Sequence, residues 1–574
     1  MKQVNKKSRL QQRSFTNRSR FVAGCLMVGA FILMTQAIYL QVVDQDFLND
    51  QAAARQVRIA SLPAHRGTIT DRNGEPLAVS TPVDSVWAKP AELLGGQEHL
   101  PLLAKLLGIE RGELTAKLTR NSEKDFLFLK RHMNPSDAAR IKAQKMPGVH
   151  LQREYRRYYP AAEVTGHLVG FANIDDVGQE ALELAFDHRL AGRPGKKRVL
   201  QDRKGHVVED IERIEAPEPG QNIVTSIDLR IQYLAYRELK KAVRDHGAAS
   251  GSAIVIDIHS GEVLAMVNQP SYNPNNRTQR DASRYRNRAI TDIFEPGSSI
   301  KPLIIAAGLE TSTYQPTSRI DTNPGFIQIG TKKIADKRNL GRIDLTTVLA
   351  RSSNVGATMI AMSIEPESLW QVLANFGLGR PTAAGFPGES AGLLSDYENW
   401  RSIGQATIAY GYGVSVTPLQ LAQAYSVFAA EGLMHPVSLL RVSQPAIPRR
   451  VVSKQTALAV LDMMEHVVSK EGTGRHAAVA GYRVAGKTGT TRKASVGGYI
   501  EDRYTAVFAG VAPVSNPRLS VVVVIDDPSL GKYYGGDVAA PVFSKIVADA
   551  SRILAIPPDD LSSMRNPAIT AALQ

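Results

Sequence analysis

A serine and a lysine lie three positions apart in the stretch FEPGSSIKPLIIAAGLE, residues 294–310. On a helix, Ser298 and Lys301 would share one face, and Pro302 is tolerated only if that helix has just begun. A serine becomes a good nucleophile when a base removes its proton. A lysine can be that base when burial or a neighbouring cation lowers its pKa. The pair therefore predicts a nucleophilic serine at the N-terminus of a helix, where backbone N–H groups favour a developing anion.

The spacing alone is a weak signal, because S-x-x-K recurs at Ser529–Lys532 and can simply describe a helix cap followed by a surface lysine. Two further motifs strengthen the interpretation. Residues 352–354 (Ser-Ser-Asn) stand at a second predicted helix start, and residues 487–489 (Lys-Thr-Gly) precede two predicted strands. The ordered set S-x-x-K, S-x-N and K-T-G is shared by penicillin-binding proteins and class A β-lactamases.

With these motifs, the chain resembles the class B penicillin-binding proteins, most of all their division-specific FtsI type. RGTITDRNGEPLA (residues 66–78) resembles the pedestal motif of that family, and AYGYGVSVTPLQLAQAY (residues 409–425) resembles a segment beside its active site. The resemblance extends from the N-terminal apolar segment to about residue 555. It implies a D,D-transpeptidase that cross-links peptidoglycan stem peptides ending in D-Ala-D-Ala during septum formation, and that β-lactam antibiotics inhibit.

The resemblance assigns catalytic roles to the motif residues. Ser298 would attack the carbonyl between the two D-alanines and form an acyl-enzyme, while Lys301 accepts its proton. Ser352 and Asn354 would relay protons and hold both the lysine and the substrate amide. Lys487 would attract the terminal carboxylate of the substrate.

The rest of the K-T-G region is predicted to bind substrate. Thr488 and Thr490 offer hydroxyl donors to the carboxylate, and Gly489 lets the substrate backbone approach the strand edge. By resemblance, the backbone N–H groups of Ser298 and Thr490 form the oxyanion hole, where losing one donor costs about a hundredfold in rate. Four tyrosines are candidate walls of the site, with ordinary packing as the alternative: Tyr410, Tyr412, Tyr533 and Tyr534.

Other polar residues are assigned structural roles or are not expected to form a site. Arg66 and Asp71 are expected to pin the pedestal turn. The twelve histidines show no spacing typical of metal ligands, so neither a metal nor another cofactor is predicted. Glu295, the acid nearest to the motif serine in the chain, is expected to cap a turn that faces away from the helix.

The N-terminus has the composition of a membrane anchor. Residues 1–20 carry seven of the cations behind the formal net charge of +14 and no acid, and residues 21–43 are uncharged. About 20 apolar residues span a bilayer as a helix, so residues 21–43 are predicted to cross the inner membrane once, with a cleaved signal peptide as the alternative. The basic flank places residues 1–20 in the cytoplasm and the remainder in the periplasm. Such local charge also argues against a nucleic-acid-binding surface.

Local patterns predict individual elements of an α+β fold. Asn73-Gly74 marks a hairpin turn, and residues 178–195 have helical spacing ended by glycine. A helix over 226–243 and two strand pairs enclose a helix-rich stretch from about 298 to 475, as in a penicillin-binding domain with an antiparallel sheet and a helical subdomain. EAPEPG (215–220) is the predicted joint. Three parts follow the anchor: an irregular α/β pedestal of the dimerisation type at 44–220, the transpeptidase domain at 221–556 and a loose tail at 557–574.

Three alternative functions are weighed against the septal transpeptidase. A β-lactamase would need a second base that activates water, and no Glu-x-x-x-Asn occurs between Asn354 and Lys487, where class A enzymes carry it. A β-lactam sensor would need cytoplasmic signalling machinery, for which residues 1–20 are too few. An elongation-type or conditional paralogue would carry out the same reaction in another role. Only the overall resemblance of the sequence to the division-specific type favours the septal role over this alternative.

The resemblance also implies partners. Residues 44–220 contain no evident glycosyltransferase module, so glycan polymerisation is assigned to a polytopic SEDS-type, FtsW-like partner. Other divisome membrane proteins, the lipid bilayer, stem peptides and β-lactams complete the set, which contains no nucleic acid.

Overall fold

The computed structural model describes residues 4–45, 57–201, 207–276, 282–495 and 498–564. The chain forms two compact units, one of residues 1–64 with 193–218 and one of residues 65–192 with 219–574. The second unit contains every residue of the predicted site. The predicted domain boundaries after residues 43, 220 and 556 stay predictions.

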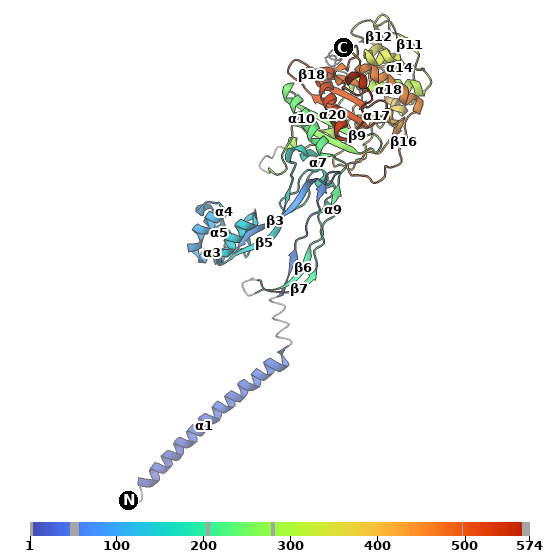
Figure 1. Cartoon of the computed structure of the whole chain (residues 1–574). Helices are drawn as coiled ribbons and strands as arrows, with labels where there is room; N and C mark the ends of the chain where they lie inside the picture. Colours follow the sequence, from blue (N-terminus) through green and yellow to red (C-terminus); the bar gives the residue numbers. More distant parts are fainter. Residues whose placement is uncertain (1–3, 46–56, 202–206, 277–281, 496–497, 565–574) are drawn as a thin grey trace. The chain divides into compact units, whose positions relative to one another are not determined.

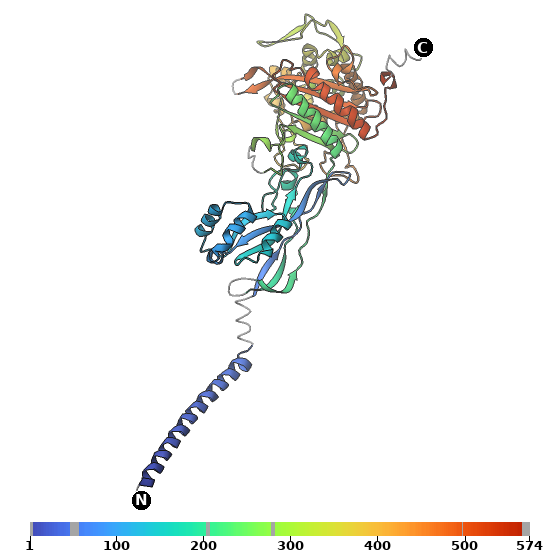
Figure 2. The same ribbon diagram turned by 60° about the vertical axis from the view of Figure 1, so that its left-hand side comes forward.

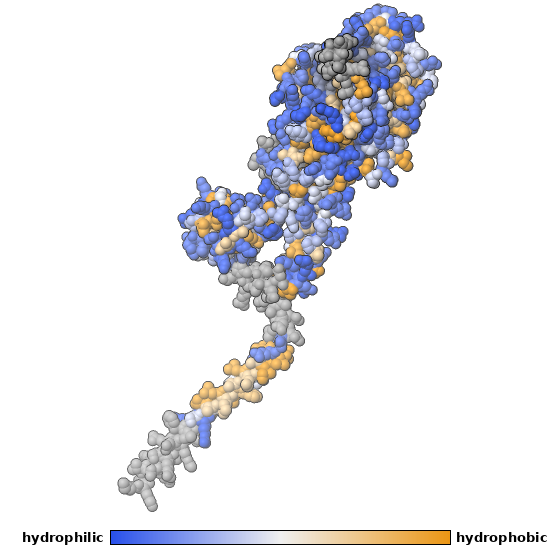
Figure 3. Space-filling model, viewed as in Figure 1, coloured by the Kyte–Doolittle hydropathy of each residue, from blue (hydrophilic) through white to orange (hydrophobic). Residues whose placement is uncertain are grey.

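The first unit begins with one long helix, α1 (Val4–Ile38), and a π-helical turn, η1 (Tyr39–Val43). Residues 18–43 are long and apolar enough to cross a membrane, and their large side chains are exposed, Phe31 and Leu33 by 72% each. Figure 3 shows the apolar band along this helix. An apolar helix without a protein core around it fits the predicted single-pass anchor.

A small antiparallel sheet completes the first unit. It joins segments that lie far apart in the sequence, in the order β1-β6-β7. The strands are β1 (Val57–Leu62), β6 (Gly195–Gln201) and β7 (Val207–Glu215).

In the second unit, the pedestal sequence forms a mixed sheet covered by short helices (Figure 1). Its strands are β2 (Ile69–Thr70), β3 (Pro76–Ala88), β4 (Leu127–Met133), β5 (Val149–Tyr158) and β8 (Ile223–Val224). Its helices are α3 (Pro90–Gly95), α4 (Leu100–Leu107), α5 (Arg111–Arg120) and α6 (Pro135–Ala143). The hairpin predicted at Asn73-Gly74 is confirmed, because β2 and β3 pair on either side of it.

A buried ion-pair cluster holds the start of the pedestal. The fully buried guanidinium of Arg66 donates to Glu183 Oε2 over 2.8 Å and to Asp187 Oδ1 over 2.7 Å. Arg157 donates to the other carboxylate oxygen of Glu183 over 2.6 Å. The two arginines and the two acids compensate each other's charge away from water, so the structural role predicted for Arg66 is confirmed.

The structure corrects the helix predicted within residues 178–195. It has two short helices there, α8 (Ala181–Ala185) and α9 (Asp187–Leu190). The chain leaves helical geometry between them at Phe186, which has a φ of −113° and a ψ of 20°. Glu183 and Asp187, on either side of this residue, both form ion pairs with Arg66.

Asp71 ties the pedestal hairpin to the transpeptidase sequence. Its carboxylate accepts from the backbone N–H groups of two hairpin residues and from Leu229 N over 3.1 Å. The structural role predicted for Asp71 is thereby confirmed. The helix predicted over 226–243 is α10 (Leu229–Asp245), and it begins later because Asp228 caps it with its side chain.

The transpeptidase sequence is built on a five-stranded antiparallel sheet in the order β10-β9-β19-β18-β17. The strands are β9 (Ser250–Asp257), β10 (Val263–Gln269), β17 (Ala485–Ser495), β18 (Gly498–Ala512) and β19 (Leu519–Asp526). Both predicted strand pairs are confirmed. The K-T-G residues lie on the edge strand β17 itself, not ahead of the strands.

Helices cover both faces of this sheet (Figures 1 and 2), which confirms the α+β class. One face packs against α10 and α20 (Ala540–Ile553). The other belongs to a larger core that includes α12 (Lys301–Glu310) and α17 (Pro418–Ala429). The helical subdomain adds α13 (Leu345–Ala350), α14 (Asn354–Met362), α15 (Pro366–Asn375), α16 (Ser402–Ile408) and α18 (Lys454–Val468).

Part of the predicted loose tail is packed on the domain. The carboxylate of Asp559 accepts from Arg483 N over 2.7 Å and from Ser515 N over 3.0 Å. The prediction of a loose tail is therefore wrong for residues 557–564. The Asp559 side chain binds backbone N–H groups of distant residues, and no sequence pattern indicates these contacts. Residues 565–574 of that prediction lie outside the described residues.

Arg66→Ala should lower the free energy of unfolding by about 3 kcal/mol, the usual cost of leaving a buried charge without its partner. Arg157 still faces Glu183, which keeps the loss at the low end. Denaturant unfolding of the purified chain measures it. Arg193→Ala is the matched control, because that guanidinium is 83% exposed and its removal should change little. Equal losses in the two variants would contradict the role of burial.

Candidate active site

The candidate nucleophile sits in a tight turn that leads into a buried helix. The 3₁₀ turn η5 (Gly297–Ile300) carries Ser298, and α12 follows with Pro302 in its first turn, as the sequence predicts. Ser298 is half-buried, and its hydroxyl makes no hydrogen bond to any described residue. Lys301, one turn further, is fully buried.

The second S-x-x-K motif has a different setting. The Ser529 hydroxyl donates to Gly247 O over 2.8 Å in an exposed loop, and Lys532 is exposed. This pair therefore lacks the burial that a lysine base requires.

The S-x-N motif surrounds the Lys301 amine with oxygen atoms. Lys301 Nζ donates to Ser352 O and to Asn354 Oδ1, each over 2.7 Å, and lies 3.3 Å from Ser352 Oγ. Carbonyl oxygens only accept, so the first two contacts occupy two N–H bonds of the amine. A neutral amine then has its lone pair left for a hydroxyl proton. The arrangement suits a lysine that takes up a proton and returns it.

Burial and a second cation favour the neutral form of Lys301. Burial lowers the pKa of Lys301 well below its usual value, Lys487 lowers it further, and Asp336 partly offsets both. Lys487 is also fully buried, which lowers its pKa to about 7. Two neighbouring buried lysines resist being protonated together, so the charge of Lys487 adds to burial in disfavouring the protonated form of Lys301.

The Lys487 amine is held at the edge strand. Its Nζ donates to Thr488 O over 3.3 Å and to Thr488 Oγ1 over 3.2 Å, and that hydroxyl donates to Thr473 Oγ1 over 3.1 Å. No carboxylate of the described residues forms an ion pair with Lys487, so its charge is available to an incoming anion. Across the same residues, no group of three or more His, Cys, Asp or Glu is arranged to hold a metal ion.

Glycines let the nucleophile turn approach β17. A Cβ on Gly489 would lie 2.6 Å from Pro296 O, so this residue makes room for the turn itself and not only, as predicted, for a substrate backbone. Gly297 has a φ of +56°, and a Cβ there would lie 3.5 Å from Thr490 N. The backbones of Ser298 and Thr490 therefore lie near each other, as two donors of one oxyanion hole must.

Tyr410 and Tyr412 belong to an aromatic cluster that Glu295 braces. Their ring centroids are 5.7 Å apart, and Tyr412 contacts Tyr499 at 5.2 Å. Glu295 Oε1 accepts from Tyr499 OH over 3.1 Å and from Gly413 N over 2.8 Å. The sequence predicts that this acid caps a turn facing away from the helix; in the structure its carboxylate accepts a backbone N–H of Gly413 and also supports the cluster through Tyr499. Tyr499 was not predicted, since nothing in its sequence context links it to the motifs.

Tyr533 and Tyr534 belong to a second cluster on the K-T-G side of the site. The Tyr533 ring stacks on Tyr504 with centroids 4.1 Å apart and contacts Tyr534 at 4.4 Å. The next residue, Gly535, donates its N–H to Thr490 Oγ1 over 2.9 Å. That contact leaves the threonine proton free for a ligand.

A cavity of about 450 Å³ adjoins these elements without containing the motifs. Its lining includes Phe294, Glu295, Thr491 and Arg492, but none of the predicted catalytic residues. Two of its lining residues, Phe294 and Glu295, directly precede the nucleophile turn in the sequence, but the cavity is not the candidate site itself.

Sequence reasoning missed Asp336, which fixes the S-x-N loop. Its Oδ2 accepts from Ser353 Oγ over 2.5 Å, and its Oδ1 accepts from Asn354 N over 2.5 Å and from Val355 N over 3.1 Å. These donors begin α14, so the carboxylate caps that helix. Ser352, just before, adopts a left-handed backbone with a φ of +59°. No spacing connects position 336 with the motif, so only the fold reveals the contact.

Comparison with known families identifies both domains. Residues 61–225 match the penicillin-binding protein dimerisation domain, and residues 251–548 match the penicillin-binding protein transpeptidase domain. The chain therefore belongs to the class B penicillin-binding proteins, which are serine-type transpeptidases. The resemblance drawn from the motifs is confirmed.

Full-length relatives narrow the type. The chain is 42% identical over 551 residues to the peptidoglycan D,D-transpeptidase FtsI of Escherichia coli K12, covering 95% of this chain and 93% of the relative. It is also 42% identical over 541 residues to the probable peptidoglycan D,D-transpeptidase PbpC of Pseudomonas aeruginosa, covering 93% of this chain and 96% of that protein. Both relatives are thus described as peptidoglycan D,D-transpeptidases, and one of them is FtsI.

Solved structures agree with this placement. The transpeptidase domain of Burkholderia pseudomallei penicillin-binding protein 3 is 43% identical, with a TM-score of 0.54, over 58% of this chain and 97% of that one. Penicillin-binding protein 3 of Mycobacterium tuberculosis in complex with aztreonam is 28% identical, with a TM-score of 0.68, over 87% of this chain and 98% of that one.

Asp336→Ala should slow acylation by a β-lactam by about tenfold to a hundredfold, because a loop freed by one lost capping contact can cost about 1–3 kcal/mol in positioning. Stopped-flow acylation measures it. Asp344→Ala is the matched control, since Asp344 caps the neighbouring helix α13 in the same way and contacts none of the motif residues. The control should lose stability but keep its acylation rate. A similar slowing in both would point to general loosening.

The acylation rate constant should follow a bell-shaped dependence on pH. It should rise as Lys301 loses its proton and becomes a base. It should fall again near pH 7, as Lys487 with its pKa of about 7 loses the charge that attracts the carboxylate. Lys487→Arg keeps a cation at high pH and should remove the falling limb. A falling limb that persists in this variant would assign it to another group.

Proposed function

We propose that this chain is a membrane-anchored peptidoglycan D,D-transpeptidase that works through an acyl-enzyme on Ser298, in septal cell-wall synthesis, and that β-lactams inhibit by acylating the same serine. The observation that carries the proposal is the buried amine of Lys301, held by Ser352 and Asn354 one turn from the serine and next to a second lysine. This is the arrangement expected for a serine activated by a neutral lysine.

In the first half-reaction, Ser298 Oγ attacks the carbonyl carbon between the two D-alanines, and its proton passes to the Lys301 amine. The resulting oxyanion is stabilised by the backbone N–H groups of Ser298 and Thr490. The C–N bond then breaks, and the leaving D-alanine amine receives a proton from Lys301 by way of Ser352. An ester between the stem peptide and the serine remains.

In the second half-reaction, an amine of a neighbouring stem peptide attacks the ester. The lysine amine takes the proton from the attacking nitrogen and returns it to Ser298 Oγ as the ester bond breaks. The products are a new amide cross-link and the free serine, so atoms and protons balance. Lys487 and Thr488 hold the terminal carboxylate of the donor until the first bond breaks.

The anchor and the pedestal support a function at the membrane. The basic flank beside the apolar span supports an N-terminus in the cytoplasm and a catalytic unit in the periplasm. Full-length identity to FtsI supports the septum as the place of action, with an elongation-type or conditional role as the alternative. An FtsW-like polymerase and other divisome membrane proteins are the partners that a chain without its own glycosyltransferase would need. A fluorescent fusion that labels the side wall instead of midcell would favour the alternative.

Ser298→Ala should abolish labelling by fluorescent penicillin and leave the melting temperature nearly unchanged, because a half-buried hydroxyl without a hydrogen bond contributes little to stability. In the wild-type chain the penicilloyl adduct should last many minutes to hours, since no carboxylate of the described residues forms a hydrogen bond with the Ser298 hydroxyl or the Lys301 amine. Intact-mass spectrometry after removal of free drug follows both. Labelling of Ser298→Ala would show that another residue is the nucleophile. Turnover of the adduct within seconds would contradict the transpeptidase assignment and indicate a hydrolase.

A further inference from the structure

One cation beside the active site has no role in the proposed reaction. Lys337 follows β13 (Lys332–Ala335) and stands next to Asp336. The backbone N–H of Asp336 donates to Gly325 O over 3.0 Å, and its carboxylate caps α14. The chain is therefore fixed at position 336 from two directions, and Lys337 starts from a defined point on the S-x-N side of the site.

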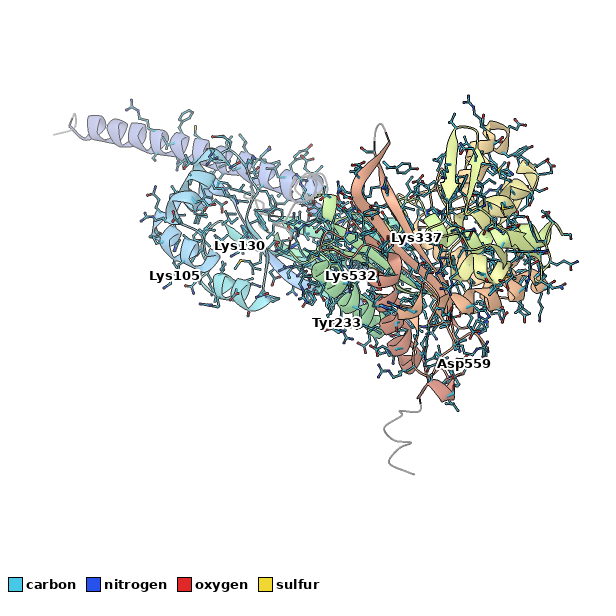
Figure 4. All side chains as sticks on the ribbon, turned by 90° about the horizontal axis from the view of Figure 1, so that it is seen from above. Lys105, Lys130, Tyr233, Lys337, Lys532 and Asp559 are labelled. Carbon is cyan, nitrogen blue, oxygen red and sulfur yellow. The ribbon has the colours of Figure 1, made fainter. Side chains whose placement is uncertain are left out.

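The side chain of Lys337 reaches the K-T-G side. Its Nζ lies 4.3 Å from the centroid of the Tyr534 ring. Tyr534 directly precedes Gly535, which is bonded to Thr490 on β17. Figure 4 marks Lys337 where its segment meets the strands of the sheet. Lys337 therefore connects the two motif-bearing sides between which a substrate has to bind.

The charge of Lys337 is not compensated. No carboxylate in the described part of the chain forms an ion pair or hydrogen bond with it, and the adjacent Asp336 is engaged by the S-x-N loop. The other exposed charged residues within 331–342 are all basic: Lys332, Lys333, Arg338 and Arg342. A ring face holds a cation more weakly than a carboxylate that forms charge-assisted hydrogen bonds. A carboxylate ligand can therefore replace the Tyr534 contact.

We propose that Lys337 binds a second carboxylate of the donor stem peptide and leaves the Tyr534 ring to do so. This inference rests on the proposed function, because the donor peptide is the substrate of that site. The terminal carboxylate is assigned to the fully buried Lys487, whereas Lys337 is exposed. Stem peptides carry further free carboxylates on their acidic residues. A peptide that lies along β17 from Lys487 toward Tyr534 brings one of them to Lys337, which then distinguishes an acidic stem from an amidated one.

The test uses two donor peptides in which a thioester replaces the scissile amide. They differ in one acidic residue, a free carboxylate in the first and a carboxamide in the second. For the wild-type chain, kcat/KM for thiol release should favour the free carboxylate by about tenfold, as one charge-assisted contact does. Lys337→Ala should remove the preference, and Lys337→Glu should reverse it. High salt should weaken the wild-type preference, because the contact is exposed.

Lys333→Ala is the matched control. Lys333 lies on β13, and its Nζ is 4.0 Å from the centroid of the Phe326 ring, so the variant loses the same charge and the same kind of contact. Its ring partner lies on the paired strand β12 (Phe326–Ile329) and not on the K-T-G side, so the peptide preference should persist.

The outcomes separate the two proposals. An unchanged preference in Lys337→Glu, or an equal loss in Lys333→Ala, would overturn the role of Lys337 while the transpeptidase assignment stands. Failure of the wild-type chain to release thiol from either peptide would overturn the proposed function, and the inference about Lys337 with it.

Discussion

The burial of two lysines in one site is the constraint on which the rest of the structure depends. Lys301 and Lys487 are both fully buried, and an ammonium away from water is destabilising unless a counter-charge meets it. The fold offers them neutral oxygens, from the S-x-N motif for one and from Thr488 for the other. Losing one proton relieves this conflict. Burial and the neighbouring cation thus both lower the pKa of the Lys301 amine near the serine.

Three separate elements of the fold must come together to hold the two buried lysines beside the serine. The nucleophile comes from the turn before α12, the oxygen atoms from the start of α14, and the second lysine from the edge strand β17. Glycines at 297 and 489 allow backbone contact where a side chain would keep the turn and the strand apart. Asp336 adds a negative charge that acts on Lys301, and its carboxylate accepts hydrogen bonds from the Ser353 hydroxyl and from backbone N–H groups of α14. The amine therefore feels this charge without being paired by it.

Residues that belong to a local sequence motif could be predicted. Residues that contact a segment far away in the sequence could not. The order of the three motifs, the strand pairs and the hairpin at Asn73-Gly74 are local patterns, and the structure contains them. Asp336 contacts a loop seventeen residues further along the chain, and no sequence pattern at position 336 indicates this contact. The role of Glu295 and the packing of the tail through Asp559 were missed for the same reason. Each satisfies a donor that comes from a distant segment, and only the folded chain brings the two together.

Position 352 is subject to two opposing requirements, because Ser352 has a left-handed backbone and also places its hydroxyl near the Lys301 amine. A residue with a side chain is strained there by roughly 1–2 kcal/mol, and glycine would relieve that strain. Glycine would also remove the hydroxyl beside the Lys301 amine. Selection for a well-folded chain and selection for a working one therefore favour different residues at the same codon. Variants sorted for solubility alone would drift toward glycine here, and only cells that need the cross-linking reaction would hold the serine in place.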